Sequence, residues 1–390
     1  MRRVILIGVG ACVTQSLLAG PLSPPGAPLS TYKTLTDVEP RKVLYNDFVG
    51  LNPIVIDSPG SYYLGENIDA FHSEHGIQIL APNVTLDLNG YTITGNTEVG
   101  SLDGINLGPE ANNVTILNGT IQAFFGDGIG AEGRSGLRVQ GVRCQFNGEK
   151  GLVGGPGAVV SDSYFDGNGD YGVFLTSQAT VENCVANNTN TFSGFDLGGG
   201  SIARGCTAND NNGDGFNMSS GSIAENCTAF SNGGSGFDAS ITSIFRGCTA
   251  SVNNTGFDMG GHSQAINCSA RGNVSNGFVL GFESRVEACI ADSNGSHGIF
   301  VGGTHNTIIN NHVSSNTGAG IDVPSDHNVI DANHATNDII HISGDKNSIT
   351  RNISYVAVPP AIIDLGVDNV TGGSSTNPSL AGPWANIRIP

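Results

Sequence analysis

Two pairs of histidines are the first groups in this sequence that could do chemistry. His305 and His327 are 22 residues apart, and His312 and His334 are separated by the same interval. If the chain winds with a period of this length, each pair lies on consecutive turns and its imidazoles come within reach of each other. Imidazole nitrogens are common ligands of Zn²⁺ and Cu²⁺. The alternative is an ordinary exposed corner, because Lys346 fills the same repeat position as His305 and His327.

A series of acidic residues is the second candidate group. Asp196, Asp238 and Asp258 each follow a Gly-Phe pair, and Asn217 and Asp322 stand at equivalent places. If the apolar residue of each pair points inward along a strand, the next side chain faces solvent. Stacked carboxylate and amide oxygens can coordinate Ca²⁺. The alternative is a solvated acidic face in which Asn217 dilutes the charge repulsion.

The elements that would position these residues are set by a repeat. Six cysteines and ten asparagines recur at a nearly constant step of 20 to 22 residues. The cysteines are Cys184, Cys206, Cys227, Cys248, Cys268 and Cys289. The asparagines are Asn147, Asn168, Asn190, Asn211, Asn232, Asn253, Asn273, Asn294, Asn316 and Asn337. A fixed period in the twenties is typical of a solenoid.

The residues inside one period identify the type of solenoid. The repeat at 221–239 contains short runs separated by Gly, Asn or Ser, and it lacks both the apolar spacing of a helix and the frame of leucine-rich repeats. Residues that tolerate positive φ, Asn or Gly, precede each periodic cysteine except Cys289, which follows Ala288. We therefore predict an all-β fold, a right-handed parallel β-helix with about three short strands per coil of 20 to 24 residues, capped at both ends.

Several segments carry a family resemblance. Residues 87–95, 306–311, 327–333 and 346–352 resemble the right-handed parallel β-helix repeat proteins of the pectate-lyase-like superfamily, a group that includes carbohydrate-binding and NosD-like periplasmic proteins. The resemblance extends from about residue 60 to residue 363. It implies a fold more than an activity, because one fold hosts many functions.

The periodic polar residues have structural interpretations. Stacked asparagines inside a corner can bond to one another and to the backbone of the next coil. The cysteines can serve as small inward fillers, or they can form disulfides between coils, although parallel side chains approach poorly for the required dihedral. Glu182, Arg204, Glu225 and Arg246 alternate in sign from coil to coil, which predicts ion pairs that fix the register.

The ends of the chain suggest processing and capping segments. We expect an export signal at 1–20, a Pro-rich linker at 21–30, an N-terminal cap at 31–60, the β-helix at 61–356 and a C-terminal cap at 357–390. A lipoprotein-type site with a lipidated Cys12 is the alternative to simple cleavage of the signal. No segment of the sequence is long and apolar enough to span a membrane.

The net charge of the chain limits the classes of partner that it can bind. The formal net charge is −18, which disfavours binding to nucleic acid or to an anionic membrane, since both depend on cationic contacts. Gly-x-Ser-x-Gly, His-Glu-x-x-His and phosphate-loop motifs are absent from the sequence. Catalysis is therefore left open.

Three functional hypotheses follow. The first is an exported protein that binds extracellular or cell-surface glycan, or serves as a surface structural module, without assured catalysis. The second, implied by the resemblance, is a Ca²⁺-dependent polysaccharide lyase or related enzyme, with the aspartates as cation ligands and Arg134, Arg138 or Arg143 as the base. The third is a periplasmic metal-handling protein that uses the histidine pairs, as the NosD-like resemblance implies.

Overall fold

The computed structural model describes residues 40–46, 53–70, 74–96, 102–355, 362–376 and 381–389. By internal contacts the chain divides into two units, residues 1–40 and 41–390. The predicted export signal, Cys12 and the predicted linker lie outside the described residues. No helix long and apolar enough to cross a membrane occurs among the residues described.

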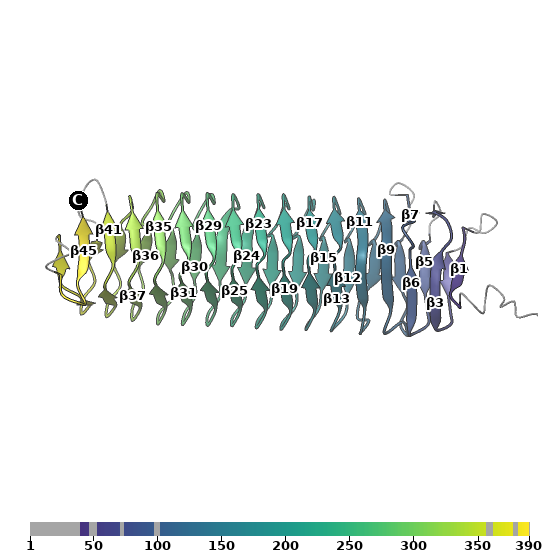
Figure 1. The fold of residues 1–390 in the computed structure, drawn as a ribbon, viewed down its shortest axis with the longest axis horizontal. Helices are drawn as coiled ribbons and strands as arrows, with labels where there is room; N and C mark the ends of the chain where they lie inside the picture. The colour runs from purple at the N-terminus through teal and green to yellow at the C-terminus, as the bar shows by residue number, and fades with distance from the viewer. Residues whose placement is uncertain are drawn as a thin grey trace, which may run out of the picture. The chain divides into compact units, whose positions relative to one another are not determined.

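Short parallel strands stack into three columns, because each coil contributes one strand to each column (Figure 1). The first column forms a separate sheet of 15 strands, here called the narrow sheet: β2 (Ile54–Ile56), β5 (Ile77–Ile79), β8 (Ile105–Leu107), β10 (Ile129–Ala131), β12 (Leu152–Gly154), β15 (Val173–Leu175), β18 (Phe195–Leu197), β21 (Phe216–Met218), β24 (Ser235–Ala239), β27 (Thr255–Met259), β30 (Phe278–Leu280), β33 (Ile299–Val301), β36 (Ile321–Val323), β39 (Ile340–Ile342) and β42 (Ile362–Asp364).

The second and third columns belong to one sheet of 30 strands, here called the wide sheet, because the long strands β9 (Thr115–Gln122) and β11 (Arg138–Gln145) run through both columns. The other strands of the second column are β1 (Lys42–Leu44), β3 (Gly60–Leu64), β6 (Val84–Asp87), β13 (Val159–Ser161), β16 (Thr180–Glu182), β19 (Ile202–Arg204), β22 (Ile223–Glu225), β25 (Ile244–Arg246), β28 (Gln264–Ile266), β31 (Arg285–Glu287), β34 (Thr307–Ile309), β37 (Val329–Asp331), β40 (Ser348–Thr350) and β43 (Val370–Thr371). Those of the third column are β4 (Ile68–Asp69), β7 (Thr92–Thr94), β14 (Tyr164–Asp166), β17 (Val185–Asn187), β20 (Thr207–Asn209), β23 (Thr228–Phe230), β26 (Thr249–Ser251), β29 (Ser269–Arg271), β32 (Ile290–Asp292), β35 (His312–Ser314), β38 (His334–Thr336), β41 (Ile353–Tyr355) and β45 (Asn386–Ile389), with β44 (Ser374–Ser375) paired to β45.

Each strand pairs in parallel with the equivalent strand of the next coil, so the predicted β-helix with three strands per coil is confirmed. For example, Phe195 lies opposite Phe216, Ala203 opposite Ala224, and Ala208 opposite Ala229. The pairing extends beyond the predicted limits of 61–356. Strands β1 and β2 lie in the stretch predicted as the N-terminal cap, and β42 to β45 in the stretch predicted as the C-terminal cap.

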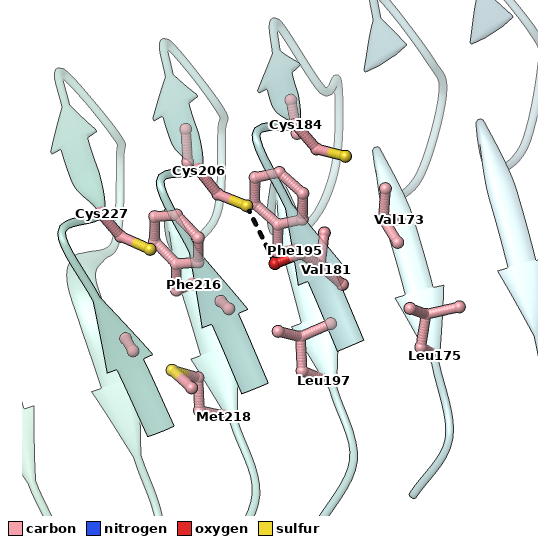
Figure 2. Close-up of a cluster of buried hydrophobic side chains, with 14 of the residues drawn as sticks. Val173, Leu175, Val181, Cys184, Phe195, Leu197, Cys206, Phe216, Met218 and Cys227 are labelled. Carbon is pink, nitrogen blue, oxygen red and sulfur yellow. Dashed lines mark hydrogen bonds between the residues drawn. The ribbon is translucent and has the colours of Figure 1, made fainter. Parts of the chain in front are cut away.

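The core is built from apolar side chains at equivalent positions stacked coil on coil, and several of these stacks contain identical residues, such as Phe195 and Phe216 (Figure 2). Phe195, Phe216, Phe237, Phe257 and Phe278 are fully buried, and successive rings stack with centroids 4.8 to 4.9 Å apart. This distance is the strand spacing of a β-sheet, which is why a period in the sequence becomes a contact in space. Stacking of identical side chains fixes the register of the coils.

The six periodic cysteines occupy equivalent buried positions between the second and third strands of their coils. Their thiols donate to the carbonyl oxygen two residues earlier, as from Cys184 Sγ to Glu182 O at 3.2 Å, and they are free rather than disulfide-bonded. Ser163 holds the same position one coil earlier and donates to Ser161 O. After Cys289 the position passes to asparagines, listed in chain order as Asn311, Asn333, Asn352 and Asn386.

The asparagine ladder lies at the corner after the third strand and is confirmed for eight of the ten predicted residues. In its continuous part each amide nitrogen donates to the amide oxygen one coil further on, as from Asn211 to Asn232 at 2.9 Å. Two assignments were wrong. Asn190 and Asn337 are exposed, and the ladder positions in their coils are held by Thr189 and Asp338.

Two further sequence predictions hold at the corners and along the second column. The residues before the periodic cysteines have φ between 52° and 62°, including Ala288 at 53°. Arg204 pairs with Glu182 at 3.2 Å and with Glu225 at 3.0 Å, and Arg246 pairs with Glu225 at 3.2 Å. These exposed pairs contribute only about 0.2–1 kcal/mol each, so their main effect is on register.

Candidate functional site

The outer face of the narrow sheet carries the largest concentration of functional side chains. Its strands are three to five residues long, so one side chain of each points outward between two buried ones. The strand register lines these outward residues up in one row, given in chain order as Val55, Gln78, Asn106, Gly130, Val153, Phe174, Asp196, Asn217, Asp238, Asp258, Val279, Phe300, Asp322, His341 and Ile363.

The predicted aspartates Asp196, Asp238 and Asp258 are brought together in this row. Asn217 donates to Asp196 at 3.1 Å, and Asp238 lies directly opposite Asp258. Burial raises the pKa of Asp196 and Asp258, and burial together with neighbouring carboxylates raises the pKa of Asp238 to about 6. The carboxylates are therefore partly desolvated and repel one another.

The predicted Ca²⁺ ligands line up along the sheet, one to a strand. Among the described residues, no group of three or more His, Cys, Asp or Glu side chains is placed to hold a metal ion. The aspartates fit hydrogen bonding to hydroxyl groups better, because a carboxyl group with a raised pKa can accept or, when protonated, donate.

Beside the row runs a line of side chains that includes several aspartates, each immediately before the glycine that opens a narrow-sheet strand. We call this line the pre-glycine column, and sequence reasoning missed it. Its members accept the backbone N–H of the next coil: Asp103 Oδ1 from Asp127, Asp127 Oδ1 from Lys150, and Asp214 Oδ1 from Ser235. The fixed place before each glycine is the signal that could have revealed it.

The column also contains an ion pair. Burial raises the pKa of Asp127 to about 6, although Lys150 Nζ lies 3.6 Å from its Oδ1 atom. Asn106 donates to Asp103 Oδ2 at 2.9 Å, and the Asp103 N–H donates to His75 Nδ1. The side chains of Asp103, Asp127 and Lys150 link successive coils. A structural role therefore accounts for charged residues at these positions.

An aromatic platform, formed by Tyr171, Phe174 and Phe192, lies next to the acidic part of the row. Tyr171 and Phe192 stack with centroids 4.9 Å apart and planes inclined by 14°, and Tyr171 lies 5.4 Å from Phe174. Phe192 is 44% exposed. Phe174 lies directly opposite Asp196 in the strand register, so the platform adjoins the carboxylates. Burial and the charges of Asp196 and Asp170 raise the pKa of Tyr171.

A histidine–carboxylate group lies at the other end of the row. His341 Nδ1 is 2.6 Å from Asp322 Oδ1, and His297 Nε2 is 3.8 Å from Asp322 Oδ2. The His297 ring also packs against Phe300, with centroids 5.8 Å apart. Three chemically active side chains therefore meet on two neighbouring strands and the corner before them.

The predicted basic residues do not join the aspartates. Arg138 and Arg143 lie on β11 of the wide sheet, where Arg143 packs over the Tyr164 ring, and Arg134 binds backbone carbonyls at a corner. The aspartates lie on the narrow sheet. The structure therefore does not bring Arg138 and Arg143 onto the sheet of the predicted carboxylates, whereas Arg134 lies at the corner that follows β10 of the narrow sheet.

The predicted histidine pairs stack as expected but remain separate. Ring centroids are 5.2 Å apart for His305 and His327, and 5.1 Å apart for His312 and His334. The first pair lies at the corner before the second column and the second pair in the third column. Burial and the neighbouring His312 lower the pKa of His334. Among the described residues, neither pair is part of a group of three or more His, Cys, Asp or Glu side chains placed to hold a metal ion.

Comparison with known proteins places the chain in a family. The model of the right handed beta helix region matches residues 52–180 and 152–288, which is more than half of the chain. The protein belongs to this family of right-handed β-helices. No curated protein sequence matches it.

Several solved structures share the fold. The A-module of the mannuronan C-5 epimerase AlgE6 from Azotobacter vinelandii aligns over 85% of this chain and 91% of that chain, with 15% identity and a TM-score of 0.45. A double mutant of the periplasmic alginate epimerase AlgG covers 80% and 77%, with 11% identity and a TM-score of 0.41. The receptor-binding domain of the Siphovirus 9NA tailspike covers 92% and 78%, with 9% identity and a TM-score of 0.41.

Proposed function

We propose that this protein binds a glycan along the outer face of the narrow sheet. The observation that carries the proposal is the aromatic platform of Tyr171, Phe174 and Phe192, in which Phe192 is exposed and the other two rings are half-buried, beside a row of carboxylates and amides. Aromatic rings cover the apolar C–H faces of sugar rings, while fixed polar groups take their hydroxyls. A stacked Tyr and Phe pair presents such a surface without further rearrangement.

The charge of the face selects among glycans. Burial raises the pKa of Asp196, Asp214, Asp238 and Asp258, and the charge of a neighbouring aspartate adds to this for the first three. Lys150 is engaged with Asp127. Like charges across an interface suppress the wrong partner. The ligand in this proposal is therefore an uncharged polysaccharide rather than a polyuronate.

If the ligand is an extracellular or cell-surface polysaccharide, the protein must act outside the cytoplasm. Residues 1–20 remain our predicted export signal, and lipidation at Cys12 remains its alternative. The mass of the N-terminal peptide from the mature protein distinguishes cleavage near residue 20 from a diacylated Cys12.

The test is a panel of neutral and acidic polysaccharides, followed by calorimetry with the strongest ligand. Phe192→Ala should weaken binding at least tenfold. Phe230→Ala is the matched control, because Phe230 is 45% exposed but lies on the wide sheet. Equal affinities for both variants, or preferential binding of polyuronates, would contradict the proposal.

A further inference from the structure

The hydrogen bond between Asp322 and His341 sets the protonation of the imidazole. Asp322, on β36, is 9% exposed, and its Oδ1 atom lies 2.6 Å from Nδ1 of His341, the residue directly opposite on β39. An ionised carboxylate can only accept, so the imidazole donates from Nδ1. In the neutral ring Nε2 then carries a lone pair, and the side chain is 31% exposed. This is the arrangement of a general base oriented by a carboxylate.

His297 has the opposite tautomer. Its Nδ1 accepts the backbone N–H of Ala319 at 3.0 Å, so the proton of the neutral ring is on Nε2, on the side of Asp322. A metal ion bound at Nε2 would need that proton on Nδ1 instead, against the backbone donor. His297 is therefore a hydrogen-bond donor beside the base, and the group is better suited to proton transfer than to metal binding.

The surroundings favour water as the nucleophile. Among the described residues, no Ser, Thr or Cys side chain is hydrogen-bonded to His341. The Phe300 ring next to His297 extends the same outer face that carries the aromatic platform. A sugar polymer lying on this face would therefore bring its substituents to His341.

We propose that Asp322 and His341 form the general base of an esterase site that removes acyl groups from a bound glycan. Nε2 of His341 takes a proton from water as the water oxygen bonds to the acyl carbon. The bond from that carbon to the sugar oxygen then breaks, and the sugar oxygen takes the proton back from the imidazolium. The products are a carboxylic acid and a free hydroxyl. His297 Nε2–H donates to the acyl oxygen, which gains negative charge during the attack.

This inference rests on the proposed glycan binding, so the two are measured separately. The full chain is incubated with O-acetylated and deacetylated forms of the neutral polysaccharide it binds best, and released acetate is quantified alongside affinity. General-base catalysis contributes roughly 10²- to 10⁴-fold. His341→Gln should lower kcat at least 100-fold while KM and the affinity for the deacetylated polymer change less than twofold.

Two further variants make the result specific. Asp322→Asn keeps the shape of the side chain but removes the charge that fixes the tautomer, so kcat should fall at least tenfold. His327→Gln, at an exposed corner away from the face, should leave kcat unchanged. Binding without acetate release by the wild-type protein, or full activity of His341→Gln, overturns the esterase site alone. If Phe192→Ala binds the polymer as tightly as the wild-type protein, the proposed function is overturned instead.

Discussion

Replacing Asn232 by alanine should remove about 2–6 kcal/mol of the free energy of unfolding. Its side-chain oxygen accepts from the backbone N–H and the amide nitrogen of Asn211, at 3.1 and 2.9 Å. Its amide nitrogen donates to Ala208 O and to Asn253 Oδ1, at 3.1 and 2.8 Å. Asn211 Nδ2 keeps its bond to Ala186 O, and Asn253 Oδ1 keeps the backbone N–H of residue 232. Alanine therefore leaves two buried groups, Asn211 N–H and Ala208 O, without the Asn232 side chain, and each such group costs about 1–3 kcal/mol, less whatever an entering water recovers.

The matched control for this variant is Asn190→Ala. Asn190 belongs to the same numerical series but is exposed, so its replacement should change the free energy of unfolding by less than about 0.5 kcal/mol. Urea unfolding followed by circular dichroism measures both variants. Hydrogen exchange of the Asn211 amide shows whether the opening is local, as a repeat architecture allows. Equal stability of the two variants would refute the ladder reasoning.

Four further outcomes follow from the structure. Burial raises the pKa of Asp338 from 3.8 to about 6, so the folded state holds the proton more tightly than the unfolded state does. This contribution to stability is lost as pH rises from about 4 to about 6. Asp338→Asn should remove the pH dependence and, in urea titrations, stabilise the protein at pH 7 by up to about 3 kcal/mol. Ala288→Gly should raise stability by about 0.5–1 kcal/mol, because a left-handed alanine costs more than the added chain entropy of glycine, and an unchanged or lower melting temperature would contradict this. Dithiothreitol should leave the melting temperature unchanged, and thiol reagents should modify the seven described cysteines only after unfolding, because burial raises the pKa of thiols such as that of Cys289. Affinity for oligosaccharides should rise with length up to about six sugars, since Phe174 and Phe300 are six coils or about 29 Å apart and an extended hexose spans roughly one coil step of ~4.8 Å.

The fold could be predicted from the sequence because a coil of constant length turns sequence period into contact. The Gly-Phe pairs, the cysteines and most ladder asparagines were identified in this way. The two errors in the ladder, Asn190 and Asn337, have a local cause. Corners contain several adjacent polar positions, and only backbone geometry decides which of them points inward. A shift of one residue changes a buried amide into an exposed one.

The site was harder to predict because period does not reveal which face a residue occupies. Arg138 and Arg143 lie in a different column of strands from the aspartates, and Arg134 lies at a corner. The contact between Asp322 and His341 was not predicted, because these two residues are only 19 apart in the sequence. The two histidine pairs that were predicted are each separated by 22 residues. The column before the glycines was missed because its members differ in chemistry and share only their position.

Glycan binding along the outer face of the narrow sheet is tested most sharply by the structure of a complex with the tightest-binding neutral oligosaccharide. We expect sugar rings packed on Phe174 and Phe192, with the polymer following the row of outward residues toward Asp322. A ligand seated on the wide sheet, or at a coil corner away from this face, would contradict it.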